Sequence, residues 1–335
     1  MVLGDLLTLA IKKNASDLHL SAGLPPILRI DGDLQTLHLA SLDQENLLAV
    51  IQKIMNKEQQ NIYQKRLEID FALQFDDQYR LRVNIFTQMR GISAVFRIIP
   101  TKIKTIEELD FPIIFKKIAS YTKGLILVTG PSGSGKSTTL AALIDYINSY
   151  QNKHIITIED PIEFVHKSNH CLIHQREVYR DTHSFASALR SALREDPNII
   201  MLGELRDYET IRLAMTAAET GHLVFATLHT NSATKAVNRI IDAFPGEEKS
   251  TIRTLLSESL QAVIAQTLLK KRGGGRVAAF EIMISTPAIR NLIRENKIAQ
   301  MYSSIQTGQT MGMQTLEQHI EKLKTARLIA EEETS

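Results

Sequence analysis

The first hundred residues alternate between short strand-like and helix-like hydrophobic patterns. The segment ILRIDGDLQTL (27–37) places Asp31-Gly32 between two apolar runs, which predicts a β-hairpin. Apolar and polar residues alternate in FALQFDDQYRLRVNIF (71–86) around a turn at Asp76-Asp77, and GISAVFRII (91–99) follows after a second turn. In SLDQENLLAVIQKIM (41–55) the apolar stripe is helical, and Ser41 with Gln44 suits a capping box. We therefore predict a small α/β domain over residues 1–100.

From Gly124 the pattern changes to continuous apolar runs separated by helical segments. The runs are LILVT (125–129), HIITI (154–158), NIIML (198–202) and HLVFATL (222–228). Such runs are typical of a parallel sheet that is covered on both faces. We predict a linker at residues 101–120 and a second α/β domain over residues 121–335. Beyond about Asp242 we expect helices, with TIRTLLSESLQAVIAQTLL (251–269) as the longest stripe and KKRGGGR (270–276) as an exposed loop.

Composition agrees with a soluble chain of about two domains. Of its 335 residues, 44% are apolar and 23% charged, which disfavours disordered and fibrous classes. The formal net charge of +2 gives no whole-chain argument for nucleic-acid binding. Cys171 is the one cysteine, which excludes an intramolecular disulfide and a tetracysteine zinc site and favours a reducing cytoplasm. No apolar run approaches the roughly 18 residues that span a bilayer, so we expect no transmembrane segment.

Residues 130–138, GPSGSGKST, match the phosphate-binding pattern G-x-x-x-x-G-K-[ST] between a predicted strand and the helical TTLAALIDYI (138–147). Glycines let successive amides curl inward, and the helix N-terminus adds its positive end. Lys136 would then reach the β and γ phosphates, and the Ser137 hydroxyl would hold Mg²⁺. The alternative is a glycine-rich turn with an exposed lysine. The pattern predicts an ATP cradle formed by Gly130, Pro131, Ser132, Gly133, Ser134, Gly135, Lys136, Ser137 and Thr138.

Polar residues end the other apolar runs. Glu159 and Asp160 follow HIITI, Gly203 and Glu204 follow NIIML, and His229 follows HLVFATL. Because the carboxyl ends of parallel strands lie at one sheet edge, we expect these side chains around the same phosphates as Lys136.

Glu204 is the candidate that orients and deprotonates the attacking water. Its alternative role is an ion pair with Arg206 or another arginine. His229 would sense the γ-phosphate or simply satisfy local hydrogen bonds. His222, at the start of the same apolar run, is a further candidate for the nucleotide site.

Four segments resemble, in order, the Walker A, Asp-box, Walker B and His-box motifs of the type II/IV secretion ATPase superfamily. They are GPSGSGKSTT, TIEDPIEFVH, ALREDPNIIMLGELRD and GHLVFATLHTNSA. AIRNLIRE (288–295) resembles a signature of its retraction branch, the type IV pilus retraction ATPases. The similarity starts at ASDLHLSAGLPP (15–26) and covers nearly the whole chain. It implies a PAS-like N-terminal α/β domain and a RecA-like P-loop ATPase domain with a helical C-terminal part, assembled as a homohexamer.

The resemblance also implies roles for residues outside the cradle. Arg82 and Arg97 match arginines that approach the phosphates from the N-terminal domain, with Arg80 as a nearby rival and ordinary surface charge as the alternative. Glu163 of the Asp box would have a polar role near Mg²⁺ or its water. In AIRNLIRE the apolar residues form one helical stripe, which suits a core helix, a transmitting helix or both.

The expected function is therefore a hexameric motor that couples Mg²⁺-ATP hydrolysis to pilus retraction, pilin disassembly and twitching motility. Its partners would be the other protomers and an inner-membrane pilus platform protein. The motor itself would be a cytoplasmic protein that is peripheral to the inner membrane. Two alternatives stay open. One is a nucleic-acid translocase, which the near-neutral charge and the absence of tryptophan oppose. The other is a nucleotide-gated regulatory module of a pilus or secretion motor.

Overall fold

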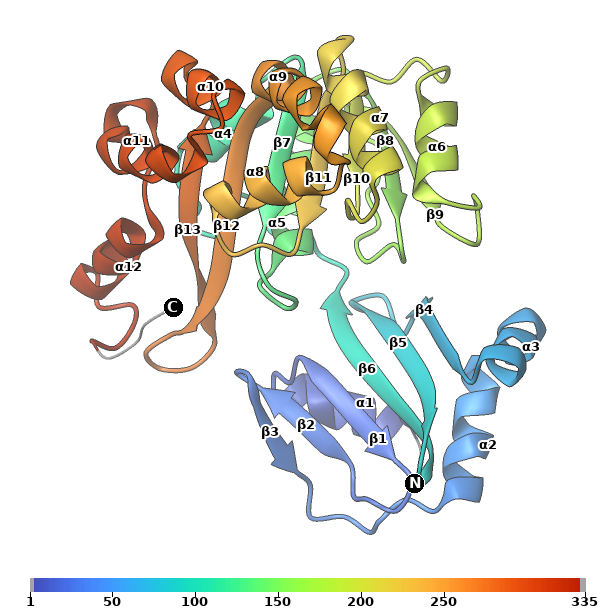
Figure 1. Ribbon diagram of the computed structural model, residues 1–335. Helices are drawn as coiled ribbons and strands as arrows, with labels where there is room; N and C mark the ends of the chain where they lie inside the picture. The colour runs from blue at the N-terminus through green and yellow to red at the C-terminus, as the bar shows by residue number, and fades with distance from the viewer. Residues whose placement is uncertain (1–2, 332–335) are drawn as a thin grey trace. The chain divides into compact units, whose positions relative to one another are not determined.

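The computed structural model describes residues 3–331 and divides the chain into two compact units, unit 1 (Met1–Lys102) and unit 2 (Ile103–Ser335) (Figure 1). Residues 1–2 and 332–335, the outer ends of the two predicted domains, lie outside the described residues. Each unit has a hydrophobic cluster of its own.

Unit 1 is an antiparallel sheet with helices. Within the described residues its six strands lie in the order β3-β2-β1-β6-β5-β4. Both predicted hairpins are confirmed, as β2–β3 and β4–β5. The elements are α1 (Leu3–Lys12), β1 (Asp17–Ser21), β2 (Ile27–Ile30), β3 (Asp33–Thr36), α2 (Gln44–Ile54), α3 (Lys57–Arg66), β4 (Glu68–Gln74), β5 (Tyr79–Gln88) and β6 (Gly91–Pro100).

The helix predicted over residues 41–55 is confirmed, but its cap is not the predicted one. Asp43 is the N-cap, and its side chain accepts a hydrogen bond from the backbone amide of Asn46. Aspartate at this position also places negative charge at the helix N-terminus, which Ser41 cannot do.

Unit 2 begins with residues that the sequence analysis assigned to the linker. Ile106, Ile114 and Phe115 are buried in its hydrophobic cluster, so this part of residues 101–120 packs into the unit. The remaining elements alternate as strand and helix up to β11, except that β9 follows β8 without a helix between them. They are α4 (Ile114–Ala119), β7 (Gly124–Thr129), α5 (Lys136–Tyr150), β8 (His154–Glu159), β9 (Leu172–Glu177), α6 (Phe185–Ala192), β10 (Ile199–Leu202), α7 (Tyr208–Glu219) and β11 (Leu223–Leu228).

The four continuous apolar runs form parallel strands, as predicted. In the sheet order β13-β12-β7-β11-β10-β8-β9 of the described residues, β7, β11, β10 and β8 are neighbours in matched register. Leu228 of β11 pairs with Thr129 of β7, so the strand ends lie level with one another. Helices α6 and α7 cover one face, whereas α4 and α5 lie on the other (Figure 1). The phosphate-loop motif therefore begins at the carboxyl edge of a central strand.

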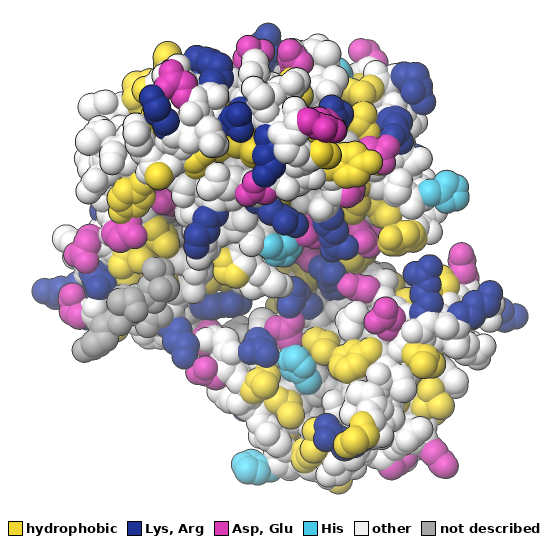
Figure 2. Space-filling model, viewed as in Figure 1, with side chains coloured by type: hydrophobic (Ala, Val, Ile, Leu, Met, Phe, Trp, Pro, Cys, Tyr) yellow, Lys and Arg dark blue, Asp and Glu magenta, His cyan; other side chains and the backbone are white. Residues whose placement is uncertain are grey.

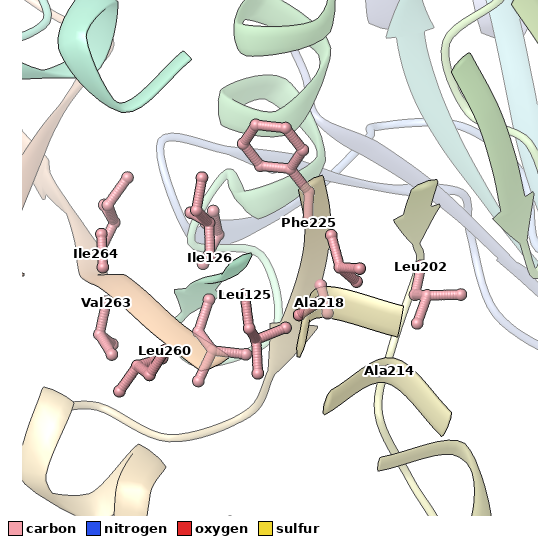
Figure 3. Close-up of a cluster of buried hydrophobic side chains, with 14 of the residues drawn as sticks. Leu125, Ile126, Leu202, Ala214, Ala218, Phe225, Leu260, Val263 and Ile264 are labelled. Atoms are coloured by element: carbon pink, nitrogen blue, oxygen red, sulfur yellow. The ribbon is translucent and has the colours of Figure 1, made fainter. Parts of the chain in front are cut away.

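The core of unit 2 lies on both faces of the sheet. Leu125 of β7 and Val263 of β12 point to the face that α7 covers with Ala214 and Ala218, whereas Ile126 and Phe225 point to the opposite face (Figure 3). All of them are buried, and removal of their apolar surface from water stabilises the sheet that carries the motif. The central strands are thus a rigid base for the loops at their ends.

The C-terminal part after Asp242 is largely helical, as predicted, but the stripe at 251–269 is not one continuous helix. The stripe at 251–269 splits into α9 (Lys249–Ser259) and β12 (Leu260–Lys270), and β12 forms an antiparallel hairpin with β13 (Arg276–Ile284) across the predicted exposed loop. A strand buried on both faces is continuously apolar and resembles a buried helix in sequence. The helices are α8 (Ala233–Asp242), α9, α10 (Pro287–Arg294), α11 (Met301–Thr307) and α12 (Leu316–Thr325), with short 3₁₀ turns at Gly246–Glu248, Ile298–Gln300 and Gln309–Met311.

Among residues 3–331, no helix is both long enough and apolar enough to cross a membrane.

Candidate functional site

The phosphate-loop motif connects the end of β7 to the start of α5. Gly130, Gly133 and Gly135 have φ angles of 148°, 77° and 90°, a region that side-chain-bearing residues rarely adopt. A Cβ on Gly130 would also overlap the backbone oxygen of Gln266. The first amides of α5 have no acceptor within the helix, because a helix leaves its first four donors unsatisfied. The loop thus presents a ring of donors and the positive end of a helix, which suits phosphate.

Lys136 is held over this loop. Its Nζ atom donates to the backbone oxygens of Gly130 at 2.8 Å and Pro131 at 2.9 Å. Burial lowers the pKa of Lys136, while the nearby carboxylates of Glu204 and Glu163 act in the opposite direction. The lysine and the two acidic residues predicted for the site therefore lie close enough to influence one another.

The hydroxyls of the motif differ in exposure. Ser132 and Ser137 are exposed and Thr138 is half-buried, whereas Ser134 is turned inward and buried. Ser137 lies in the first turn of α5, where a hydroxyl can meet a cation bound to phosphate oxygens. Within the described residues no three His, Cys, Asp or Glu side chains form a metal-holding group. Mg²⁺ suits such a site, because it is commonly held by one or two protein oxygens, water and the substrate's phosphates.

Glu204 lies between a guanidinium and an imidazole. Its Oε2 accepts from Arg206 Nε at 2.8 Å, and its Oε1 lies 3.2 Å from His229 Nε2. Both expectations for Glu204 are thus compatible: it has an arginine partner, and it stands with His229 at the loop's edge of the sheet. Glu204 keeps one fifth of its side chain exposed, so water can reach the carboxylate.

Hydrogen bonds to the backbone around Glu204 hold Glu204 and His229 next to each other at the edge of the sheet. The hydroxyl of Thr227 donates to the backbone oxygen of Gly203, and Leu205 N donates to the backbone oxygen of Thr227 at 3.0 Å. These bonds tie the residues on either side of Glu204 to β11, which ends next to His229. Their geometry is therefore set by the sheet and not by flexible loops.

The Asp box divides into a buried and an accessible part. Glu159 is buried, and its Oε1 accepts from Thr157 Oγ1 at 2.6 Å and Gln175 Nε2 at 3.1 Å. Burial raises the pKa of Glu159 to about 7. Glu159 therefore serves as an internal polar anchor, which corrects the expectation that it faces the nucleotide. Asp160 and Glu163 are half-buried and lie near Arg206 and Lys136, respectively.

Glu159→Gln should make folding stability less dependent on pH. The folded-state pKa of Glu159 is raised above its ordinary 4.5, so its contribution is complete below pH 4.5 and is lost as the pH rises through 7. Glutamine keeps an acceptor for Thr157 and Gln175 and carries no charge. We expect the melting temperature of the variant, relative to the unchanged chain, to rise by several degrees between pH 4.5 and pH 8. The exposed Glu247→Gln is the control, and a flat difference for Glu159→Gln would contradict the assignment.

His222 does not join this group. It directly precedes β11, and its backbone oxygen accepts from Gly124, the first residue of β7. Its ring Nδ1 lies 3.0 Å from the backbone oxygen of Ala217. The imidazole thus lies at the amino edge of the sheet, a full strand length from the loop, which corrects its assignment to the nucleotide site. There it lines a pocket of about 160 Å³ together with Tyr121, Lys153 and Asn198.

The two predicted arginines of unit 1 are neighbours on one face of its sheet. Arg82 of β5 pairs directly with Arg97 of β6, on the face opposite the buried side chains. Arg82 Nη2 contacts Asp70 at 2.7 Å, and Arg97 Nε contacts Asp17 at 2.9 Å. A guanidinium has five donors, so an ion pair with one carboxylate is compatible with recognition of a phosphate.

Sequence reasoning missed the residues that support the loops from β12 and β13. Gln266 of β12 contacts the phosphate loop, and Glu281 of β13 accepts at 2.6 Å from Ala233 N, at the start of the helix after His229. Both are buried polar residues in apolar strands. That contrast is the available signal, but the apolar pattern around Gln266 predicts a helix and not a strand.

The whole chain has known relatives. The family described as type II/IV secretion system protein matches residues 1–333. The type IV pilus retraction ATPase PilT of Pseudomonas aeruginosa is 59% identical over 99% of this chain and 96% of its own. A twitching motility protein of Neisseria gonorrhoeae is 56% identical over 92% of this chain and 82% of its own. The crystal structure of a pilus retraction motor PilT with bound ADP has a TM-score of 0.85 at 46% identity, over 99% of this chain and 95% of its own.

Proposed function

The chain belongs to the type II/IV secretion system protein family, and we propose that it is an Mg²⁺-dependent motor ATPase that drives type IV pilus retraction and twitching motility. The observation that carries the proposal is the full-length similarity to a pilus retraction ATPase. That similarity includes both the nucleotide site and the AIRNLIRE helix.

The site geometry supports hydrolysis of ATP. The amides of residues 133–137 and the ammonium of Lys136 bind the phosphates and stabilise charge that develops on them during transfer. Glu204 orients the attacking water and accepts its proton, and His229, 3.2 Å away, contacts the same carboxylate. His229 is therefore placed to respond to changes at the Glu204 carboxylate during hydrolysis.

The Ser137 hydroxyl would hold Mg²⁺ beside the phosphates of the nucleotide. The ion supplies charge neutralisation of the phosphate oxygens. Glu163, whose carboxylate acts electrostatically on Lys136, would hold water around the ion. Asp160 would act through Arg206 on the position of Glu204.

In this proposal the working particle is a homohexamer at the cytoplasmic side of the inner membrane, docked on a pilus platform protein. Arg82 and Arg97 would supply guanidinium groups to the phosphates in the assembled ring. Each would then exchange or share its aspartate partner, Asp70 or Asp17, with a phosphate oxygen. Hydrolysis would depend on assembly, because the arginines of unit 1 would complete the positive charge around the nucleotide only in the ring.

The two arginines of the AIRNLIRE helix, α10, differ in what they contact. Ile289 and Ile293 are buried, and Arg290 donates to the backbone oxygens of Ser257 at 2.9 Å and Glu258 at 2.8 Å. Arg290 thus caps the C-terminal end of α9. Arg294 is exposed and makes a long contact of 3.4 Å with the Ser257 hydroxyl, so its charge is available on the surface.

Arg294→Ala should therefore spare ATP turnover and melting temperature while stopping pilus retraction in cells. Arg290→Ala is the matched comparison and should cost about 1–3 kcal/mol of stability, because it leaves helix-end carbonyls without their partner. Turnover, thermal melting and twitching zones measure the three effects. Equal loss of turnover and retraction in Arg294→Ala would reduce the helix to a structural element.

Mg²⁺-ATP turnover measured alongside particle mass tests the proposed function. We expect turnover in the hexamer fraction and no stimulation by DNA or RNA at low salt. The face in Figure 2 agrees with this, since basic and acidic side chains are interspersed on both units. Nucleic-acid stimulation would favour a translocase. Nucleotide binding without Glu204-dependent turnover would favour a regulatory module.

A further inference from the structure

Gln266 is a buried amide in the middle of an apolar strand. It lies on β12, is 3% exposed, and follows the buried Ile264 and Ala265. Its Nε2 donates to the backbone oxygen of Ser134 at 2.6 Å, and its Oε1 accepts from the hydroxyl of Thr139 at 2.8 Å. One side chain thus bridges the phosphate loop and the first turn of α5, from a strand more than 120 residues away in sequence.

The backbone of Gln266 adds a second contact. A Cβ on Gly130 would overlap its carbonyl oxygen, and a Cβ on Gly135 would lie 3.3 Å from its side-chain nitrogen. The loop is therefore seated against Gln266 at its beginning, its middle and its end. Gly130 and Gly135 lie against Gln266 at positive φ, so these two glycines in the sequence allow the loop to approach Gln266 closely.

The loop needs such a support. Three glycines with positive φ give it more backbone freedom than other residues would, and ordering them costs conformational entropy. A site whose donors are already ordered binds more tightly, because this cost is met before the ligand arrives. The hydrogen bond from Gln266 fixes the peptide group between Ser134 and Gly135, and the bond to Thr139 fixes the helix that follows.

We propose that Gln266 is a positioning residue that pre-organises the phosphate loop for nucleotide from its outer side. The inference rests on the proposed function, since it assigns Gln266 to the same ATP site. Gln266 touches the loop's carbonyl and helix, and the phosphates bind the amides on the inner side. Its contribution is therefore to affinity and loop order.

A plain structural role predicts something different. If Gln266 only satisfied its own buried amide, its loss would lower stability and leave the affinity of folded molecules unchanged. Gln266→Met is the sharpest probe, since methionine has a similar length and removes both hydrogen bonds. Thr139→Val removes one of the same bonds at nearly constant shape. Leu269→Ala, a buried residue further along β12, is the control for lost packing alone.

The experiment titrates each purified full-length variant with a fluorescent ADP in Mg²⁺ buffer and records its melting temperature without nucleotide. We expect Gln266→Met to weaken ADP binding about tenfold and Thr139→Val to weaken it less, in the same direction. The double variant should bind ADP no more weakly than Gln266→Met, because the bond that Thr139→Val removes is already absent in Gln266→Met. Leu269→Ala should melt earlier and bind ADP normally.

Normal ADP affinity in Gln266→Met, with or without a lower melting temperature, would overturn the positioning role. If Gln266→Met does not fold, Thr139→Val decides alone, and normal affinity there overturns the role as well. Failure of the unchanged chain to bind ADP would overturn the proposed function together with the inference. ADP binding by the unchanged chain and normal affinity in the variants would overturn the inference alone.

Discussion

Lys136→Ala is expected to weaken ATP binding by about 100-fold or more. The reason is that Lys136 carries the positive charge of the phosphate cradle, held over the loop by the carbonyl oxygens of Gly130 and Pro131. Charge-assisted hydrogen bonds to phosphate are among the strongest in proteins, and alanine offers no replacement. Titration with a fluorescent ATP analogue measures the loss.

The control is Lys153→Ala, which removes a lysine of the same unit at the amino edge of the sheet. It should bind ATP normally. Unaltered affinity in Lys136→Ala, or equal losses in both variants, would contradict the assignment of the cradle.

Glu204→Gln is expected to retain ATP binding and to lower kcat by about 10²–10⁴-fold, the range of a lost general base. Glutamine keeps an oxygen that accepts from Arg206 and preserves the shape of the cluster with His229. It cannot take the proton of the attacking water. Single-turnover hydrolysis and nucleotide titration separate the two effects.

Glu219→Gln serves as the matched control, because Glu219 is an exposed residue at the end of α7, away from the loop edge. It should leave kcat unchanged. Normal turnover in Glu204→Gln would remove the catalytic role and leave only the ion pair with Arg206.

The phosphate edge was predictable because its signals are local. A strand of fully buried residues must be apolar throughout, so the ends of β7, β8, β10 and β11 could be read from the sequence. The polar residue after each run then fell at one edge, which brought Glu204 and His229 together. His222 was misplaced because it occupies the other end of the same run, and the run alone does not say which end meets the ligand.

The supports of the edge were not predictable from local pattern. Whether Leu260–Lys270 is helix or strand depends on its pairing with β7 and β13, which lie far away in sequence. Gln266 therefore could not be assigned to the phosphate loop. The expectation that Glu159 faces the nucleotide failed for a related reason. Glu159 is buried next to β9, where Gln175 donates to it, and β9 is too polar to be recognised from sequence as part of the sheet.

The most direct test of the central claim is amide hydrogen exchange, followed by mass spectrometry, with and without Mg²⁺-ADP. If loop amides bind the phosphates, exchange in residues 130–138 should slow strongly on addition of nucleotide, while exchange around residues 220–223 at the amino edge should stay unchanged. Unchanged exchange in residues 130–138 under conditions where ADP is bound would contradict the account.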